Sequence, residues 1–140
     1  MKNLPVLCFF ALFLSCSSSH YTPKTYKASQ LTFGSSGGVT GMIREYQLLD
    51  NGQLFMSTGV DYELKELPPV AKSETKKLFG TAGELMPDTL KFIHPGNMTY
   101  YVILKKKSGT ITVKWGESGL RAPKGVKEFY DHAISVVQHK

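Results

Sequence analysis

Residues 42–57 read MIREYQLLDNGQLFMS and form the clearest hairpin signal in the chain. Asn51-Gly52 stands between two apolar segments, and this pair tolerates the positive φ angles that a tight hairpin turn requires. In the first segment, Met42, Tyr46 and Leu48 form an apolar face, and Arg44 interrupts it. Because hairpins with short turns join antiparallel strands, the sequence predicts an antiparallel sheet built outward from these residues.

Other strands are predicted on both sides of this hairpin. Before it, Leu31 and Phe33 alternate with polar neighbours, as in a half-buried strand. After it, residues 61–64 either extend the second arm of the hairpin or form a strand of their own. Three more strands are expected between turn residues, at 90–93, 98–105 and 110–115.

Two segments have the apolar spacing of helices. In the later one, apolar side chains recur three or four positions apart, at Val126, Phe129, Tyr130, Ala133, Ile134 and Val137. The earlier one is expected after Pro68-Pro69, which suit a first helical turn, and extends to Met86. The predicted order is βββαβββα. We therefore expect one α+β domain over residues 29–140, with an antiparallel sheet of about six strands and two helices on one face.

The N-terminus, MKNLPVLCFFALFLSC, has the layout of a secretory signal peptide. Its apolar segment is shorter than the ~20 residues that a membrane-spanning helix needs. Ser15 and then Cys16 end this segment, and a cysteine in that place resembles the lipobox of bacterial lipoproteins. The resemblance implies removal of residues 1–15 and acylation of Cys16, with a diacylglycerol on its thiol and an acyl chain such as palmitate on its amine. A plain cleaved signal peptide is the alternative.

Lipidation at Cys16 predicts the location and the partners of the chain. Residues 16–28 are polar and are interpreted as a flexible tether. They contain no acidic residue, which resembles lipoproteins of the outer membrane that face the periplasm. We expect a membrane anchor in the bacterial cell envelope, a protein or other envelope partner, and no nucleic acid; the oligomeric state stays open. The formal net charge of +6 is explained by solubility, by contact with anionic lipid head groups or by an acidic partner.

The available residue types exclude several chemistries. Cys8 falls in the signal peptide and Cys16 is predicted to be lipidated, so no thiol is left for catalysis, redox exchange or zinc binding. No metal or cofactor is predicted, because the spacing of zinc ligands is lacking among the four histidines, His20, His94, His132 and His139. No local catalytic signature is present, so a protein that is not an enzyme is expected, with a spatial Ser-His-Asp set left open.

The glycine-rich segment GSSGGVTG, residues 34–41, is the candidate for binding. It lacks the lysine of a phosphate-binding loop, so a wide hairpin turn is its structural explanation. Binding residues concentrate on loops over rigid scaffolds. The candidate binding loop therefore comprises Ser36, Gly37, Gly38, Val39, Thr40, Gly41 and Met42.

The same residues, SGGVTGM, resemble the SGGFAGI-type segment of the emfourin-like proteins, small inhibitors of thermolysin-like metallopeptidases. The order of strands, glycine turn and helices agrees over about residues 29–138, whereas Val39, Thr40 and Met42 replace Phe, Ala and Ile. The resemblance implies that residues 36–42 contact a peptidase. Three hypotheses result: a non-enzymatic binding domain of a lipid-anchored envelope lipoprotein, a metallopeptidase inhibitor, and an envelope enzyme.

Overall fold

The computed structural model describes residues 20–140, so the predicted signal peptide and Cys16 lie outside the described residues. Seven strands and two helices follow one another in the order ββββαβββα. The elements are β1 (Gln30–Gly37), β2 (Met42–Leu49), β3 (Leu54–Gly59), β4 (Glu63–Leu67), α1 (Lys72–Leu85), β5 (Phe92–Ile93), β6 (Met98–Lys106), β7 (Gly109–Trp115) and α2 (Val126–Val137).

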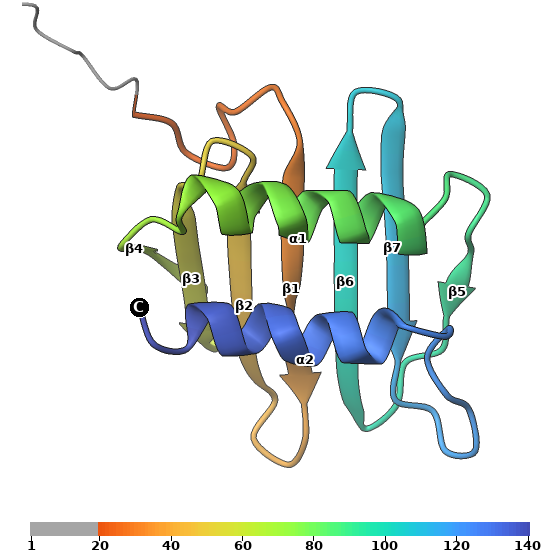
Figure 1. Cartoon of the computed structure of the whole chain (residues 1–140). Helices are drawn as coiled ribbons and strands as arrows, with labels where there is room; N and C mark the ends of the chain where they lie inside the picture. Colours follow the sequence, from red (N-terminus) through yellow and green to blue (C-terminus); the bar gives the residue numbers. More distant parts are fainter. Residues whose placement is uncertain (1–19) are drawn as a thin grey trace, which may run out of the picture.

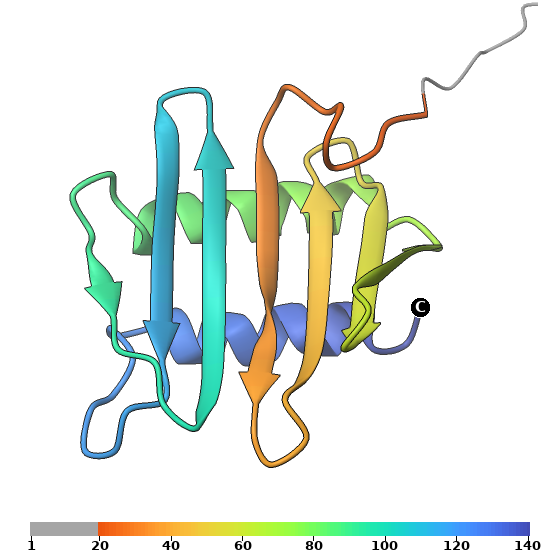
Figure 2. The same ribbon diagram turned by 180° about the vertical axis from the view of Figure 1, so that it is seen from behind.

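All seven strands form one sheet in the order β4-β3-β2-β1-β6-β7-β5. The first strand, β1, lies at its centre and pairs antiparallel with β2 on one side and with β6 on the other. The sheet strands that precede α1 in the chain thus meet the strands that follow it where β1 pairs with β6. Figure 2 shows the sheet from its helix-free side, with β1 and β6 next to each other.

Both helices cross the same face of the sheet (Figure 1). The core lies between the helices and the strands, and its fully buried members include Leu31, Phe33 and Leu48 from the sheet with Leu78 and Ala133 from the helices. The α+β class and the placement of both helices on one face are therefore confirmed. Burial of these apolar side chains is the main force that holds the two layers together.

Two details of the predicted sheet are corrected. Residues 63–67 form a strand of their own, β4, at the edge beside β3, which makes seven strands rather than about six. The sheet is also mixed, because β5 pairs in parallel with β7. Short hairpin turns enforce antiparallel pairing only between consecutive strands. The strand β5 pairs with β7, and β6 lies between these two strands in the chain. The argument from short hairpin turns therefore does not apply to the pairing of β5 with β7.

The described part of the predicted tether, residues 20–28, differs from a free chain. Tyr26 is buried in a small cluster with Leu49 and Phe55, on the helix-free side of the sheet, and its hydroxyl donates a hydrogen bond to Asp50. The Ser29 amide donates to the other carboxylate oxygen of Asp50 over 3.1 Å. The large aromatic side chain of Tyr26 thus packs on the ends of β2 and β3 and holds this segment in place. The polar composition of the segment had predicted a flexible tether.

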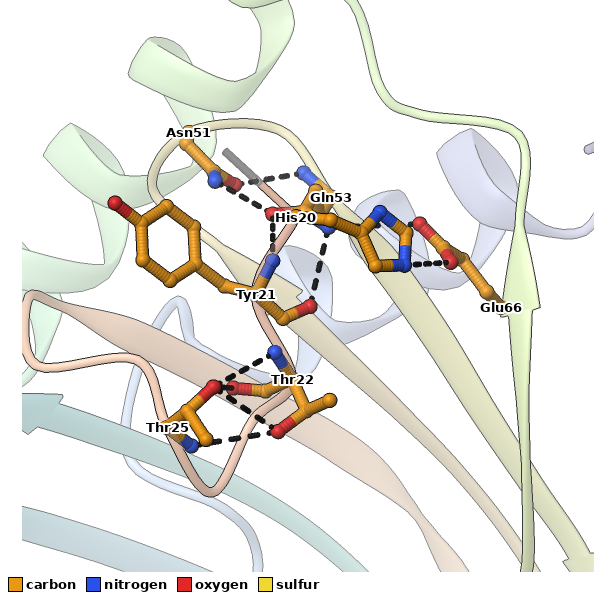
Figure 3. A network of polar contacts seen from close by, with 7 residues as sticks. All are labelled: His20, Tyr21, Thr22, Thr25, Asn51, Gln53 and Glu66. Atoms are coloured by element: carbon orange, nitrogen blue, oxygen red, sulfur yellow. Dashed lines mark hydrogen bonds and ion pairs between the residues drawn. The ribbon is translucent and has the colours of Figure 1, made fainter. Parts of the chain in front are cut away.

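A polar network fastens the start of this segment to the β2–β3 turn (Figure 3). The side-chain amide of Gln53 accepts from the Tyr21 amide at 3.3 Å and donates to the Tyr21 carbonyl at 3.1 Å. His20 contacts Glu66 of β4 at 3.0 Å. The network therefore bridges the N-terminal segment, the turn and the edge strand.

The helix-free face of the sheet is also organised by a polar contact. Tyr101 of β6 lies opposite Gly34 of β1, and Gly34 lies opposite Glu45 of β2. Because Gly34 has no side chain, the Tyr101 hydroxyl reaches across β1 and donates to Glu45 over 2.8 Å. Burial, followed by this hydrogen bond, raises the pKa of Tyr101 above its ordinary value. Although Tyr101 lies on the face without helices, it is buried, whereas its neighbour Tyr100 on the helix face stays half-buried.

Candidate functional site

The candidate binding loop lies at the end of the sheet farthest from the N-terminal segment (Figure 1). Ser36 and Gly37 end β1, residues 38–41 form the turn, and Met42 begins β2. Gly37 has a φ of +110°, and a Cβ atom there would lie 2.2 Å from the Asn97 carbonyl oxygen. The Gly38 amide donates to the same carbonyl over 2.8 Å. Glycine is thus required because the β5–β6 connection approaches the turn closely.

A surface hollow of about 420 Å³ lies beside this turn. Gly37 forms its floor, since it pairs with Met42 on one side and with Met98 on the other. The two methionines are 54% and 42% exposed, so each borders the hollow and solvent at once. Val39, at the tip of the turn, is fully exposed. Two apolar side chains, Met42 and Met98, therefore border the hollow above a glycine floor, and Val39 projects from the turn beside it.

Arg44 is the charged residue that lines this hollow. It lies in one row across the strands with Ser35 of β1 and Thr58 of β3, which also line the hollow. Among residues 20–140, Arg44 takes part in no ion pair. The site therefore combines apolar walls with one cation that is free to pair with an anionic group.

Two aromatic side chains, Tyr100 and Trp115, continue the same row next to the hollow, and a third, Tyr130, packs on them from α2. Tyr100 stacks on Trp115 with ring centres 5.9 Å apart, and Tyr130 of α2 meets both edge-on, at 5.8 and 5.3 Å. A second hollow of about 190 Å³ lies among them, bordered also by Lys127 and Asp131. Burial raises the pKa of Tyr130, while its interaction with the Ser35 hydroxyl acts in the opposite direction. Ser35 pairs directly with Tyr100, so the two hollows adjoin.

The structure brings together part of the predicted loop and adds residues from other strands. Gly37, Gly38, Thr40 and Met42 line the first hollow, whereas Ser36, Val39 and Gly41 do not. The prediction from the sequence missed five lining residues, which are Ser35, Ile43, Arg44, Thr58 and Met98. Arg44 had a visible signal, because it interrupts an apolar face. Met98 had none, since only the pairing of β6 with β1 brings it to the loop.

Three of the histidines contact carboxylates instead of converging on one another. His94 lies 3.1 Å from Glu117, and His132 lies 3.0 Å from Glu74, which links α2 to α1. His20 contacts Glu66, as described above. Within residues 20–140, no three side chains of the metal-binding types lie close enough together to hold an ion.

Comparison with known proteins found no family model that matches the chain and no curated protein with a significant match to its sequence. In the described residues, neither helix has the length and apolar character needed to cross a bilayer.

Proposed function

We propose that the chain is a lipid-anchored lipoprotein of the bacterial cell envelope, whose α+β domain binds a protein partner through the surface around its glycine turn. The observation that carries the proposal is that Met42 and Met98 line a hollow that also presents Arg44, next to the exposed Val39 at the tip of the turn. Single exposed apolar residues are common on protein surfaces, but a cluster of them around a hollow marks an interaction site.

The chemistry of these residues suits binding rather than catalysis. Methionine side chains are flexible and polarizable, so Met42 and Met98 can adapt to an apolar group of a partner. Arg44 can donate several hydrogen bonds to a carboxylate in a fixed planar geometry. The backbone below them is held by the contact between Gly38 and Asn97, which limits the entropy that ordering the loop would cost.

Site-specific cross-linking in the producing cell tests where the partner binds. A photoreactive residue at position 39 or 98 should give one defined cross-linked product, whereas the same residue at Lys105 should not. Lys105 is a matched control because it is exposed on the same strand as Met98 but lies near its other end. The partner identified in this way should bind the purified full chain saturably, and Met42→Asp should weaken that binding at least ~10-fold. Equal products from position 105, or none from any position, would refute the proposal.

The lipid anchor is tested independently of the partner. Cells given a labelled fatty acid should transfer the label to the chain, and Cys16→Ser should abolish the transfer. Several acyl chains together give stable anchoring, so the variant should also leave the membrane fraction. An unlabelled chain that is cut at or after position 16 would instead establish a plain signal peptide.

Inhibition of a thermolysin-like metallopeptidase is the second candidate, and the exposed tip of the loop favours it. The Val39 side chain projects fully into solvent from a hairpin whose base is held by hydrogen bonds. Adding the full chain to thermolysin should slow peptide hydrolysis, and Gly38→Trp or Val39→Asp should restore the rate. Val60→Asp, in another exposed turn, is the matched control and should still inhibit. Unchanged hydrolysis by several such peptidases would eliminate this candidate.

A further inference from the structure

The two adjoining hollows continue into a third one along the flank of α2. This third hollow, of about 670 Å³, lies between Trp115, the first turn of α2 and the loop that precedes the helix. Trp115 borders both the second and the third hollow. We call the continuous depression the α2 groove and define it by Met42, Met98, Ser35, Tyr100, Trp115 and Arg121.

The length of the groove matches that of a short extended peptide. A row of paired residues crosses the strands from Thr58 of β3 through Ser35 of β1 to Trp115 of β7, over four strand spacings. Neighbouring strands lie about 4.8 Å apart, so the row is about 19 Å long. An extended chain rises about 3.3 Å per residue, so about six residues span the row. Side chains of one such segment can therefore enter both the first and the second hollow.

The charges at the groove favour an acidic ligand. Arg44 lies at one end, and Arg121 and Lys124 border the other end. None of these three cations forms an ion pair within residues 20–140, whereas Asp131, the acid of the second hollow, is already paired with Lys127 at 2.6 Å. Glu128 is the one carboxylate that borders the groove without such a pair in the described chain. Cations therefore outnumber available acids along its length.

The indole of Trp115 offers a further polar contact. No residue among 20–140 accepts a hydrogen bond from it, and the described chain contains no buried side-chain nitrogen that lacks a partner. The indole N–H is therefore not fully enclosed, although the residue is only 8% exposed. A tryptophan with a buried ring and an open N–H is suited to hold a peptide carbonyl.

We propose that the α2 groove binds an extended acidic segment of the protein partner, with two apolar side chains of the segment directed into the first and second hollows. The inference rests on the proposed partner binding and specifies which kind of segment is bound. The acidic side chains of the segment pair with Arg44 at one end and with Arg121 and Lys124 at the other.

Trp115 provides the test, because it is the chain's one tryptophan and lies in the groove. The probe is a synthetic heptapeptide with Leu at its third position, Phe at its fifth, and Glu or Asp elsewhere. Titrated into the full chain in detergent, it should change the Trp115 fluorescence saturably. Lys in place of its acidic residues, or Leu and Phe moved to adjacent positions, should weaken binding at least ~10-fold.

Variants of the chain locate the binding. Arg44→Glu and Arg121→Glu should each weaken binding of the heptapeptide by about 10-fold or more, and higher salt should weaken it further. Lys105→Glu removes the same charge from the far end of β6 and should leave binding unchanged.

Three outcomes would overturn the inference. Equal binding of the basic peptide would remove the charge argument. A fluorescence response to chitin or peptidoglycan oligosaccharides, with none to the acidic peptide, would assign the groove to a glycan. If a partner is cross-linked at positions 39 and 98 but no peptide changes the fluorescence of Trp115, only the inference about the groove is refuted. If the cross-links are also absent, the proposed function is refuted as well.

Discussion

Gly34 shows how one missing side chain organises the helix-free face. A Cβ atom at this position would lie 2.2 Å from the Arg44 carbonyl oxygen, a contact that only a backbone shift can relieve. Gly34→Ala should therefore lower the free energy of unfolding by about 2 kcal/mol or more, because overpacking distorts the pairing of β1 with β2. Urea denaturation followed by circular dichroism measures the change.

Gly80 is the matched control for this substitution. It lies in α1, where an added Cβ atom meets nothing within 4 Å. Alanine is the better helix former, so Gly80→Ala should raise the free energy of unfolding by about 0.5–1 kcal/mol. A loss of stability at Gly80, or none at Gly34, would contradict the contacts described here.

Tyr26 predicts a dependence of stability on alkaline pH. Burial, followed by the hydrogen bond to Asp50, raises its pKa to about 12 from an ordinary value of 10. The folded state therefore favours the neutral phenol, and the stability that this supplies is complete below pH 10 and lost as the pH rises from 10 to about 12. Unfolding in urea across this range should show a smaller loss for Tyr26→Phe than for the parent chain. Tyr62→Phe, at an exposed tyrosine, should keep the parent slope.

At the scale of elements, the N-cap positions of the two helices differ in whether a serine can replace the residue present. Ala71 is the N-cap of α1, has an extended backbone and makes no side-chain capping bond. The Glu74 amide lies three residues further on and can donate to a serine hydroxyl at position 71, so Ala71→Ser should add about 1 kcal/mol to the free energy of unfolding.

The N-cap of α2 should respond in the opposite way. Gly125 has a left-handed φ of 82°, and a Cβ atom there would lie 2.8 Å from Leu85. Gly125→Ser should therefore destabilise the protein by about 1 kcal/mol, although serine is normally a good cap. Thermal denaturation of both variants tests the pair, and a stabilised Gly125→Ser would show that the loop before α2 rearranges freely.

The elements that the sequence predicted well are those with a local signal. The Asn51-Gly52 turn and the apolar spacing of residues 126–137 depend on neighbours in the chain, and both appear where expected. The parallel pairing of β5 with β7 depends on where the chain returns after α1. No local pattern specifies that return, so a sheet of mixed direction could not be predicted.

The candidate site also has one part that the sequence predicted and one part that it did not. The glycine turn was visible as a run of residues, and its glycines are explained by positive φ angles and a close approach. Met98 and Trp115 reach the α2 groove through pairings between strands that are distant in the chain. A binding surface assembled across β2, β1, β6 and β7 has no continuous counterpart in the sequence.

At the scale of the whole molecule, the central position of β1 predicts cooperative unfolding. Leu31 is fully buried and pairs with Leu48 on one side and Leu104 on the other, so both halves of the chain share one core. Leu31→Ala should lower the free energy of unfolding by about 2–5 kcal/mol. Fluorescence of Trp115 and far-ultraviolet circular dichroism should report the same midpoint in the parent and the variant. Separate midpoints would show that the two halves unfold independently.

Because residues 20–28 pack on the sheet, the distance between the domain and a bilayer is limited. With Cys16 anchored as proposed, residues 17–19 alone separate the lipid from docked His20, and that link spans at most about 14 Å. The docked segment lies at the end of the sheet where β1 begins, and the glycine turn lies at the other end, about 23 Å along the strand (Figure 1). The α2 groove therefore lies toward the end of the domain that is distal to the proposed lipid anchor.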